Sequence, residues 1–222
     1  MTHTVERVRR SRGRAVKAAA AVTAAGVVLM GLGGCKVGTG QREPASTKVK
    51  EVLDSGQGRF DLTRPPSRDE AGMPAGRTDV TYEREDHTPF RVRVALPEGK
   101  ELTLDARLVT FDAMAEADPK TAPPSTMDIH HYPATLAAGR DHLLAAAKEY
   151  GLDTKPILEW YEEAADPRPV QAPSTVRTPW LATKVGYLRL EVQGRYKPPV
   201  DAAGSDQTVV HYLFTWDPDP NA

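Results

Sequence analysis

The sequence predicts an α+β fold in which an antiparallel sheet of about four to five strands carries two helices packed on one face. Two stretches, residues 78–108 and 185–216, alternate apolar and polar side chains with a period of two, which is typical of half-buried strands. Between them, residues 133–164 repeat apolar side chains at steps of three and four, as amphipathic helices do. Strands that flank a helical run indicate a two-layer domain.

The first strands form a predicted hairpin. A short alternation at Val80–Tyr82 precedes a longer one over residues 90–96, in which arginines occupy the polar positions. Pro97–Lys100 supplies turn residues, and residues 102–108 then place a row of apolar side chains, ending in Leu108, on one face. On its solvent side the hairpin brings opposite charges into reach of one another: Arg91, Arg93, Glu101 and Asp105.

Helices are predicted in the middle of the sequence. Residues 114–125 are acidic and then Pro-rich, which indicates a loop. An apolar stripe then predicts a helix from about Pro133 to Tyr150, with Gly151 well placed as its C′ residue. A second helix is expected after Thr154 as N-cap, with Pro156 in its first turn.

The last part of the chain returns to strands. Four prolines between residues 166 and 179 predict an extended, irregular connection. Residues 185–192 alternate as a strand does, and residues 197–206 read as a loop. The final strand, residues 208–216, carries apolar side chains on both faces, which predicts a central place in the sheet.

Residues 35–77 are predicted to be a flexible tether rather than part of the domain. They are rich in Gly, Pro, Ser, Thr and charge, and only one short helical pattern, at Lys48–Leu53, interrupts them. The predicted organisation is therefore an N-terminal segment over residues 1–34, this tether, and a single domain over residues 78–222.

The N-terminal segment has the organisation of a signal peptide. Its basic residues outnumber its one acid, Glu6, by six to one: Arg7, Arg9, Arg10, Arg12, Arg14 and Lys17. An uncharged run follows from Ala18 to Leu32. Fifteen residues are short for a membrane-spanning helix, which takes about 20 apolar residues, but suit the apolar region of a signal peptide.

The run ends in Leu32-Gly33-Gly34-Cys35, and Cys35 is the only cysteine of the 222 residues. This motif resembles the lipobox of bacterial lipoproteins. The resemblance implies that a signal peptidase recognises Leu32, Gly33 and Gly34 and cuts before Cys35. It also implies that the Cys35 thiol carries a diacylglyceryl group, which anchors the protein on the extracytoplasmic face of the cell membrane.

The compositional bias toward Ala, Arg, Gly and Pro indicates a GC-rich actinobacterium. The Arg9-Arg10 pair leaves open whether export follows the twin-arginine or the general secretory route.

The charge after the signal peptide excludes some partners. The chain holds 29 basic and 30 acidic residues, and without residues 1–34 these become 23 and 29, a net charge of −6. An acidic domain argues against nucleic acid as a partner, because phosphate backbones attract basic surfaces. The expected partner is the membrane, reached through the lipid on Cys35, and an envelope protein or a small molecule is left open as a further partner.

No catalytic motif stands out in the sequence. The densest set of possible metal ligands comprises Asp128, His130, His131 and His142. In an extended stretch Asp128 and His130 share a face. However, no recognised zinc spacing such as His-Glu-x-x-His is present, and a catalytic zinc needs three converging protein ligands. The sequence therefore assigns no catalytic residue, no cofactor and no metal site.

These observations favour a lipid-anchored cell-envelope protein that presents a small binding domain. The alternative is an envelope hydrolase or metal-binding protein that uses the histidine region, which as an enzyme requires Asp128, His130 and His142 to converge. The binding hypothesis instead requires an exposed apolar or aromatic patch. Six aromatic residues are candidates either for such a patch or for the core: Trp160, Tyr161, Trp180, Tyr187, Tyr212 and Trp216.

Overall fold

The computed structural model describes residues 46–114, 118–166, 175–199 and 207–217. The chain divides into two units, Met1–Gln41 and Arg42–Ala222, and all of the described residues belong to the second. The signal peptide and the Leu32–Cys35 motif therefore lie outside the described residues. Among those that are described, no helix is long and apolar enough to span a membrane.

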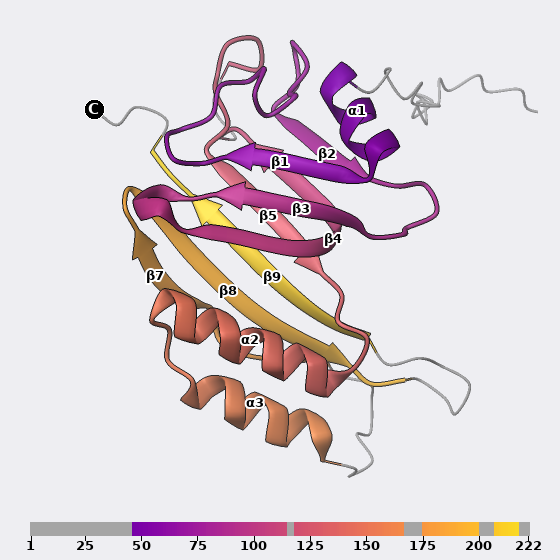
Figure 1. The fold of residues 1–222 in the computed structure, drawn as a ribbon, viewed down its shortest axis with the longest axis vertical. Helices are drawn as coiled ribbons and strands as arrows, with labels where there is room; N and C mark the ends of the chain where they lie inside the picture. The colour runs from indigo at the N-terminus through magenta and orange to yellow at the C-terminus, as the bar shows by residue number, and fades with distance from the viewer. Residues whose placement is uncertain (1–45, 115–117, 167–174, 200–206, 218–222) are drawn as a thin grey trace, which may run out of the picture. The chain divides into compact units, whose positions relative to one another are not determined.

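The second unit is α+β, as predicted, with nine described strands rather than four to five (Figure 1). The helices are α1 (Thr47–Ser55), α2 (Leu136–Tyr150) and α3 (Lys155–Ala165), with a short 3₁₀ turn, η1, at Pro97–Gly99. The strands are β1 (Gln57–Asp61), β2 (Asp79–Glu83), β3 (Phe90–Ala95), β4 (Glu101–Asp112), β5 (Thr126–His131), β6 (Val176–Arg177), β7 (Leu181–Val185), β8 (Leu188–Lys197) and β9 (Gln207–Thr215).

The sheet is built around two long strands, β4 and β8, and each of them pairs along one edge with two shorter strands. Its main order is β1-β3-β4-β5-β9-β8-β6. The first half of β4 pairs with β3 and the second half with β2, while β8 pairs in the same way with β7 and then with β6. All pairs are antiparallel except β1 with β3, which is parallel. The prediction of a purely antiparallel sheet is corrected at this one pair, and β9 is central as predicted.

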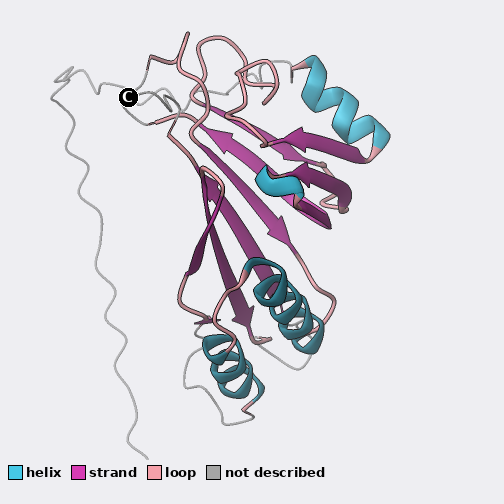
Figure 2. Cartoon of the chain, turned by 60° about the vertical axis from the view of Figure 1, so that its left-hand side comes forward, coloured by secondary structure: helices cyan, strands magenta, loops and turns pink. Residues whose placement is uncertain are grey.

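All three described helices lie on one face of the sheet, which gives the two predicted layers (Figure 2). The pair α2–α3 covers β8 and β9: a Cβ on Gly194 of β8 would lie 2.6 Å from Leu143 and 3.4 Å from Trp160. Helix α1 buries Val49 and Val52 against the same face near β1 and β2. We call this the helix-covered face, and the opposite one the open face.

A bulge in β4 changes which side chains reach the core. Between Ala106 and Leu108 the register with β5 shifts, so Arg107 is the extra residue. Leu102, Leu104 and Ala106 point inward as predicted, but Leu108 turns to the open face. The prediction for Leu108 is therefore wrong, because a strict period of two fails across a bulge.

The predicted tether is wrong for residues 46–77, which are part of the folded unit. The predicted short helix is present as α1, capped by the Ser46 hydroxyl, which accepts a hydrogen bond from the Val49 amide. After β1, Leu62, Ala71 and Met73 are buried in the core. No sequence period marks this segment. Only two residues of β1, Gly58 and Phe60, are buried, and the stretch after β1 has no regular structure.

The helix boundaries follow their predicted caps in part. Thr135 caps α2 through its hydroxyl, and Gly151 ends it in the left-handed conformation that favours glycine. Thr154 precedes α3 as predicted, but its side chain makes no capping hydrogen bond. Instead, the Asp153 carboxylate accepts the amide of Lys155.

Candidate metal centre on the open face

The strand pair β5–β9 brings three metal-ligating side chains together on the open face. His130 of β5 and His211 of β9 are directly opposite each other in the register. Asp128 precedes His130 by two residues, so its side chain points to the same face. Paired strands therefore place an aspartate and two histidines together although 80 residues separate His130 from His211 in the sequence.

The three side chains are close enough to share one ion. One atom from each lies within 4.8 Å of the other two. The Asp128 Oδ2 atom is 2.9 Å from His130 Nε2, and the Oδ1 atom is 3.8 Å from His211 Nδ1. The two imidazole rings lie side by side, with their centroids 3.8 Å apart. An aspartate and two histidines are a donor set that suits zinc and related transition metals.

Burial gives His211 the protonation state that metal binding requires. The side chain of His211 is only 6 % exposed. Its pKa is lowered to about 4, first by burial and then by the neighbouring His130. His211 is therefore a neutral imidazole at neutral pH, which is the form that binds metals.

One atom of the cluster lacks a partner. Asp128 Oδ1 is buried and accepts no hydrogen bond from any described residue. Leaving a buried acceptor unsatisfied costs about 1–3 kcal/mol, and more for a charged group. A cation held between Asp128, His130 and His211 would remove this cost.

Residues of β8 and of the connection before β7 support His211. Gln193 lies opposite it in β8, and the Gln193 side-chain amide donates to the Thr178 carbonyl. The Trp180 ring stands nearly perpendicular to the His211 ring, with centroids 6.2 Å apart. This packing fixes the imidazole and places an apolar group next to the cluster.

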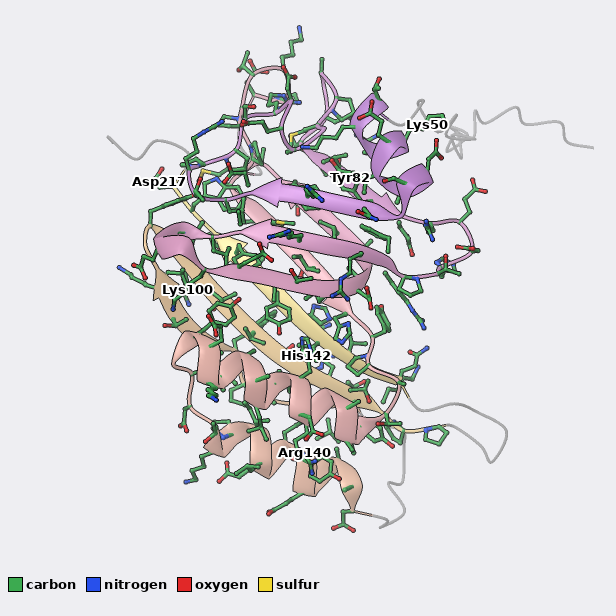
Figure 3. The ribbon with its side chains drawn as sticks, in the orientation of Figure 1. Lys50, Tyr82, Lys100, Arg140, His142 and Asp217 are labelled. Atoms are coloured by element: carbon green, nitrogen blue, oxygen red, sulfur yellow. The ribbon has the colours of Figure 1, made fainter. Side chains whose placement is uncertain are left out.

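His131 and His142, the other two predicted candidates, lie on the helix-covered face. His131 follows His130 in β5 and so points the opposite way. Figure 3 shows His142 on the side of α2 that faces the sheet, where its Nε2 atom is 2.7 Å from the Tyr212 hydroxyl. The centroids of the His131 and His142 rings are 4.4 Å apart. Together with Arg107 and Asp105, these two histidines line a cavity of about 360 Å³.

The convergence that the hydrolase hypothesis required does not occur. Asp128 and His130 are together, but the sheet separates them from His142. The third member of the cluster is His211, which sequence reasoning did not select. A signal was present, because His211 lies between Val209 and Leu213 on one face of a strand that was predicted to be central.

No known protein family, curated protein or solved structure matches this chain.

Most of the six aromatic candidates fill the core. Trp160, Tyr212 and Trp216 are buried, while Tyr161 is partly buried against the core. Trp180 and Tyr187 are exposed. Tyr187 and the exposed Met114 line a shallow hollow of about 410 Å³ beside the edge of Trp216. This hollow is the apolar surface that comes nearest to the patch that the binding hypothesis required.

Proposed function

We propose that this chain is a lipid-anchored protein of the cell envelope whose folded domain binds a divalent transition metal ion, with Asp128, His130 and His211 as ligands. The observation that carries the metal site is the convergence of these side chains around an Asp128 oxygen that no described residue satisfies. The resemblance of Leu32-Gly33-Gly34-Cys35 to a lipobox supports the proposed location at the cell membrane.

Zinc is the metal that fits the donor set best. Two neutral imidazoles and one carboxylate offer nitrogen and oxygen donors, and zinc accepts both in a tetrahedral arrangement. Three protein ligands leave the fourth position open to water or a further ligand. This open position keeps a metal-dependent hydrolase as the alternative function, because catalytic zinc sites have the same arrangement.

The test is zinc binding by the full chain after removal of metal with a chelator, followed by isothermal titration calorimetry. The wild-type chain should bind one zinc ion per molecule. Asp128→Asn and His211→Gln should each weaken binding by more than about tenfold, or about 1.4 kcal/mol. Each variant removes one ligand but keeps nearly the same side-chain volume.

His142→Gln is the matched control, because His142 is also a partly buried histidine but lies on the helix-covered face. It should bind zinc as the wild type does. A wild-type chain without a saturable zinc site, or equal losses in His142→Gln and His211→Gln, would contradict the assignment. Circular dichroism of each variant separates loss of the ligand from loss of the fold.

A further inference from the structure

A second cavity on the open face adjoins the metal centre and is lined by positive charge. It has a volume of about 220 Å³ and shares His130 and His211 with the cluster. Three cationic side chains line it: Arg177 of β6, and Arg195 and Lys197 of β8. Among the described residues that line it there is no carboxylate.

Two of these cations are directly opposed in the sheet. Arg177 and Arg195 are partners in the β6–β8 register. Like charges opposite one another on an antiparallel pair are destabilising. In the parts of the chain that the structure describes, no carboxylate lies within 4 Å of Arg177, Arg195 or Lys197. An anion between these side chains would offset the repulsion.

Three other arginines of the sheet, Arg91, Arg93 and Arg189, are each paired with a carboxylate. Arg91 pairs with Asp105 at 3.1 Å across the β3–β4 hairpin. Arg189, on the same strand as Arg195, pairs with Glu191 at 2.9 Å. Among the described residues, Arg177, Arg195 and Lys197 differ from these paired arginines in that no carboxylate lies within ion-pair distance of them.

Arg195 is held in place by a neighbouring side chain. Its Nε atom donates to the Gln193 side-chain oxygen at 2.7 Å. This bond orients the planar guanidinium, whose terminal amino groups can then bind an anion through two parallel hydrogen bonds. Burial, and secondly Arg177, lower the pKa of Arg195, which is consistent with two cations held close together at this site.

We propose that this cavity binds a phosphate group, which Arg177, Arg195 and Lys197 hold from different sides. A tetrahedral phosphate offers several oxygens to several donors, and paired arginine forks match its geometry. Ligand pockets usually measure about 300–1,000 Å³, so this smaller cavity suits inorganic phosphate or a phosphate ester with a small substituent. The site goes beyond metal binding, because its cations do not depend on a metal ion.

The test is titration of the full chain with inorganic phosphate in the presence of EDTA, followed by calorimetry. One phosphate should bind per molecule with a dissociation constant in the millimolar range or below. Arg195→Gln and Lys197→Gln should each weaken binding by at least fivefold, and the double variant Arg177→Gln/Arg195→Gln by at least fiftyfold. Arg91→Gln, which removes an arginine outside the cavity, should leave the affinity unchanged.

A parallel titration with glycerol phosphate distinguishes the two sources of the ligand. Tighter binding of this ester assigns the cavity to a phospholipid headgroup, and tighter binding of inorganic phosphate assigns it to the free ion. The proposal is overturned if neither compound gives saturable binding, or if Arg91→Gln weakens binding as much as Arg195→Gln. Asp128→Asn separates this site from the metal centre, because it should lose zinc and keep phosphate.

Discussion

His130 and His131 are adjacent in sequence, yet the strand sends them to different environments. Successive residues of β5 point to opposite faces, so His130 joins Asp128 and His211, while His131 joins His142 under α2. The sequence allowed Asp128 and His130 to be placed on one face, and the structure confirms this. The choice between His142 and His211 as the third member depended on strand pairing, which local periodicity does not specify.

His142 should make the fold sensitive to acid. Its pKa is lowered to about 4, chiefly by burial and secondly by His131. A histidine in the unfolded chain titrates near 6.5, so the unfolded state binds more protons between these values. The contribution of neutral His142 to the free energy of unfolding is fully present above about pH 6.5 and is lost as the pH falls toward 4. The free energy of unfolding should drop by roughly 2–3 kcal/mol across this window through His142 alone.

Urea unfolding at a series of pH values measures this dependence. His142→Gln keeps an acceptor for the Tyr212 hydroxyl but does not titrate, so its stability should fall less steeply with acid. The remaining slope reflects His211, whose pKa is also about 4. His87→Gln is the control, because His87 is exposed on the surface. Identical slopes for the wild type and His142→Gln would refute the assignment.

At the scale of elements, α1 and β1 should be necessary for folding. Strand β1 covers the edge of β3 and buries Phe60, while Leu62 just after it is fully buried. Removing one large buried side chain costs about 3–5 kcal/mol, and whole domains are stable by only about 5–15 kcal/mol. A chain that begins at residue 78 also exposes β3 as an unprotected edge, which promotes aggregation.

We therefore expect a chain of residues 78–222 to aggregate or to unfold without cooperativity, and a chain of residues 42–222 to unfold in one cooperative transition. Size-exclusion chromatography and thermal melting followed by circular dichroism distinguish the two. A folded, monomeric chain of residues 78–222 would show that α1 and β1 are accessory.

Elements with a long, regular pattern were predictable from the sequence, and the others were not. The β3–β4 hairpin is confirmed together with its Arg91–Asp105 and Arg93–Glu101 pairs. Helix α2 and strand β9 are also found where the pattern placed them. The strand predicted over residues 185–192 is confirmed in part, because Val185 ends β7, residues 186–187 form a turn, and β8 runs from Leu188 to Lys197. In contrast, β1 and β6 are too short for a period to register, and β5 has four polar residues in six. The metal cluster was missed in part because β5, the strand that carries Asp128 and His130, was not predicted.

At the scale of the whole molecule, the proposed lipid on Cys35 would keep the domain near the membrane. Only ten residues separate Cys35 from Ser46, the first described residue, rather than the 42 that follow Cys35 in the predicted tether. Even fully extended, this stretch spans at most roughly 40 Å. The metal centre and the adjoining cavity of the open face would then work close to the lipid surface.

The mass of the mature protein from its host tests this anchor. It should equal residues 35–222 plus a diacylglyceryl group, and the protein should partition into detergent. Cys35→Ala should abolish both, because the thiol is the point of attachment, whereas Thr39→Ala should change neither. An unmodified Cys35 in the wild-type protein would rule the anchor out.

The position of β9 has a consequence for how the molecule is assembled during synthesis. Strands β1 to β5 are complete once residue 131 has left the ribosome, but β5 finds its second neighbour only when β9, residues 207–215, emerges. Until then β5 is an open edge, and non-local pairing of this kind forms slowly. The halves of the sheet therefore join only after β9 has been synthesised. Asp128 and His130 meet His211 in that same final step, so a chain that lacks its last sixteen residues has lost β9 and retains an incomplete cluster.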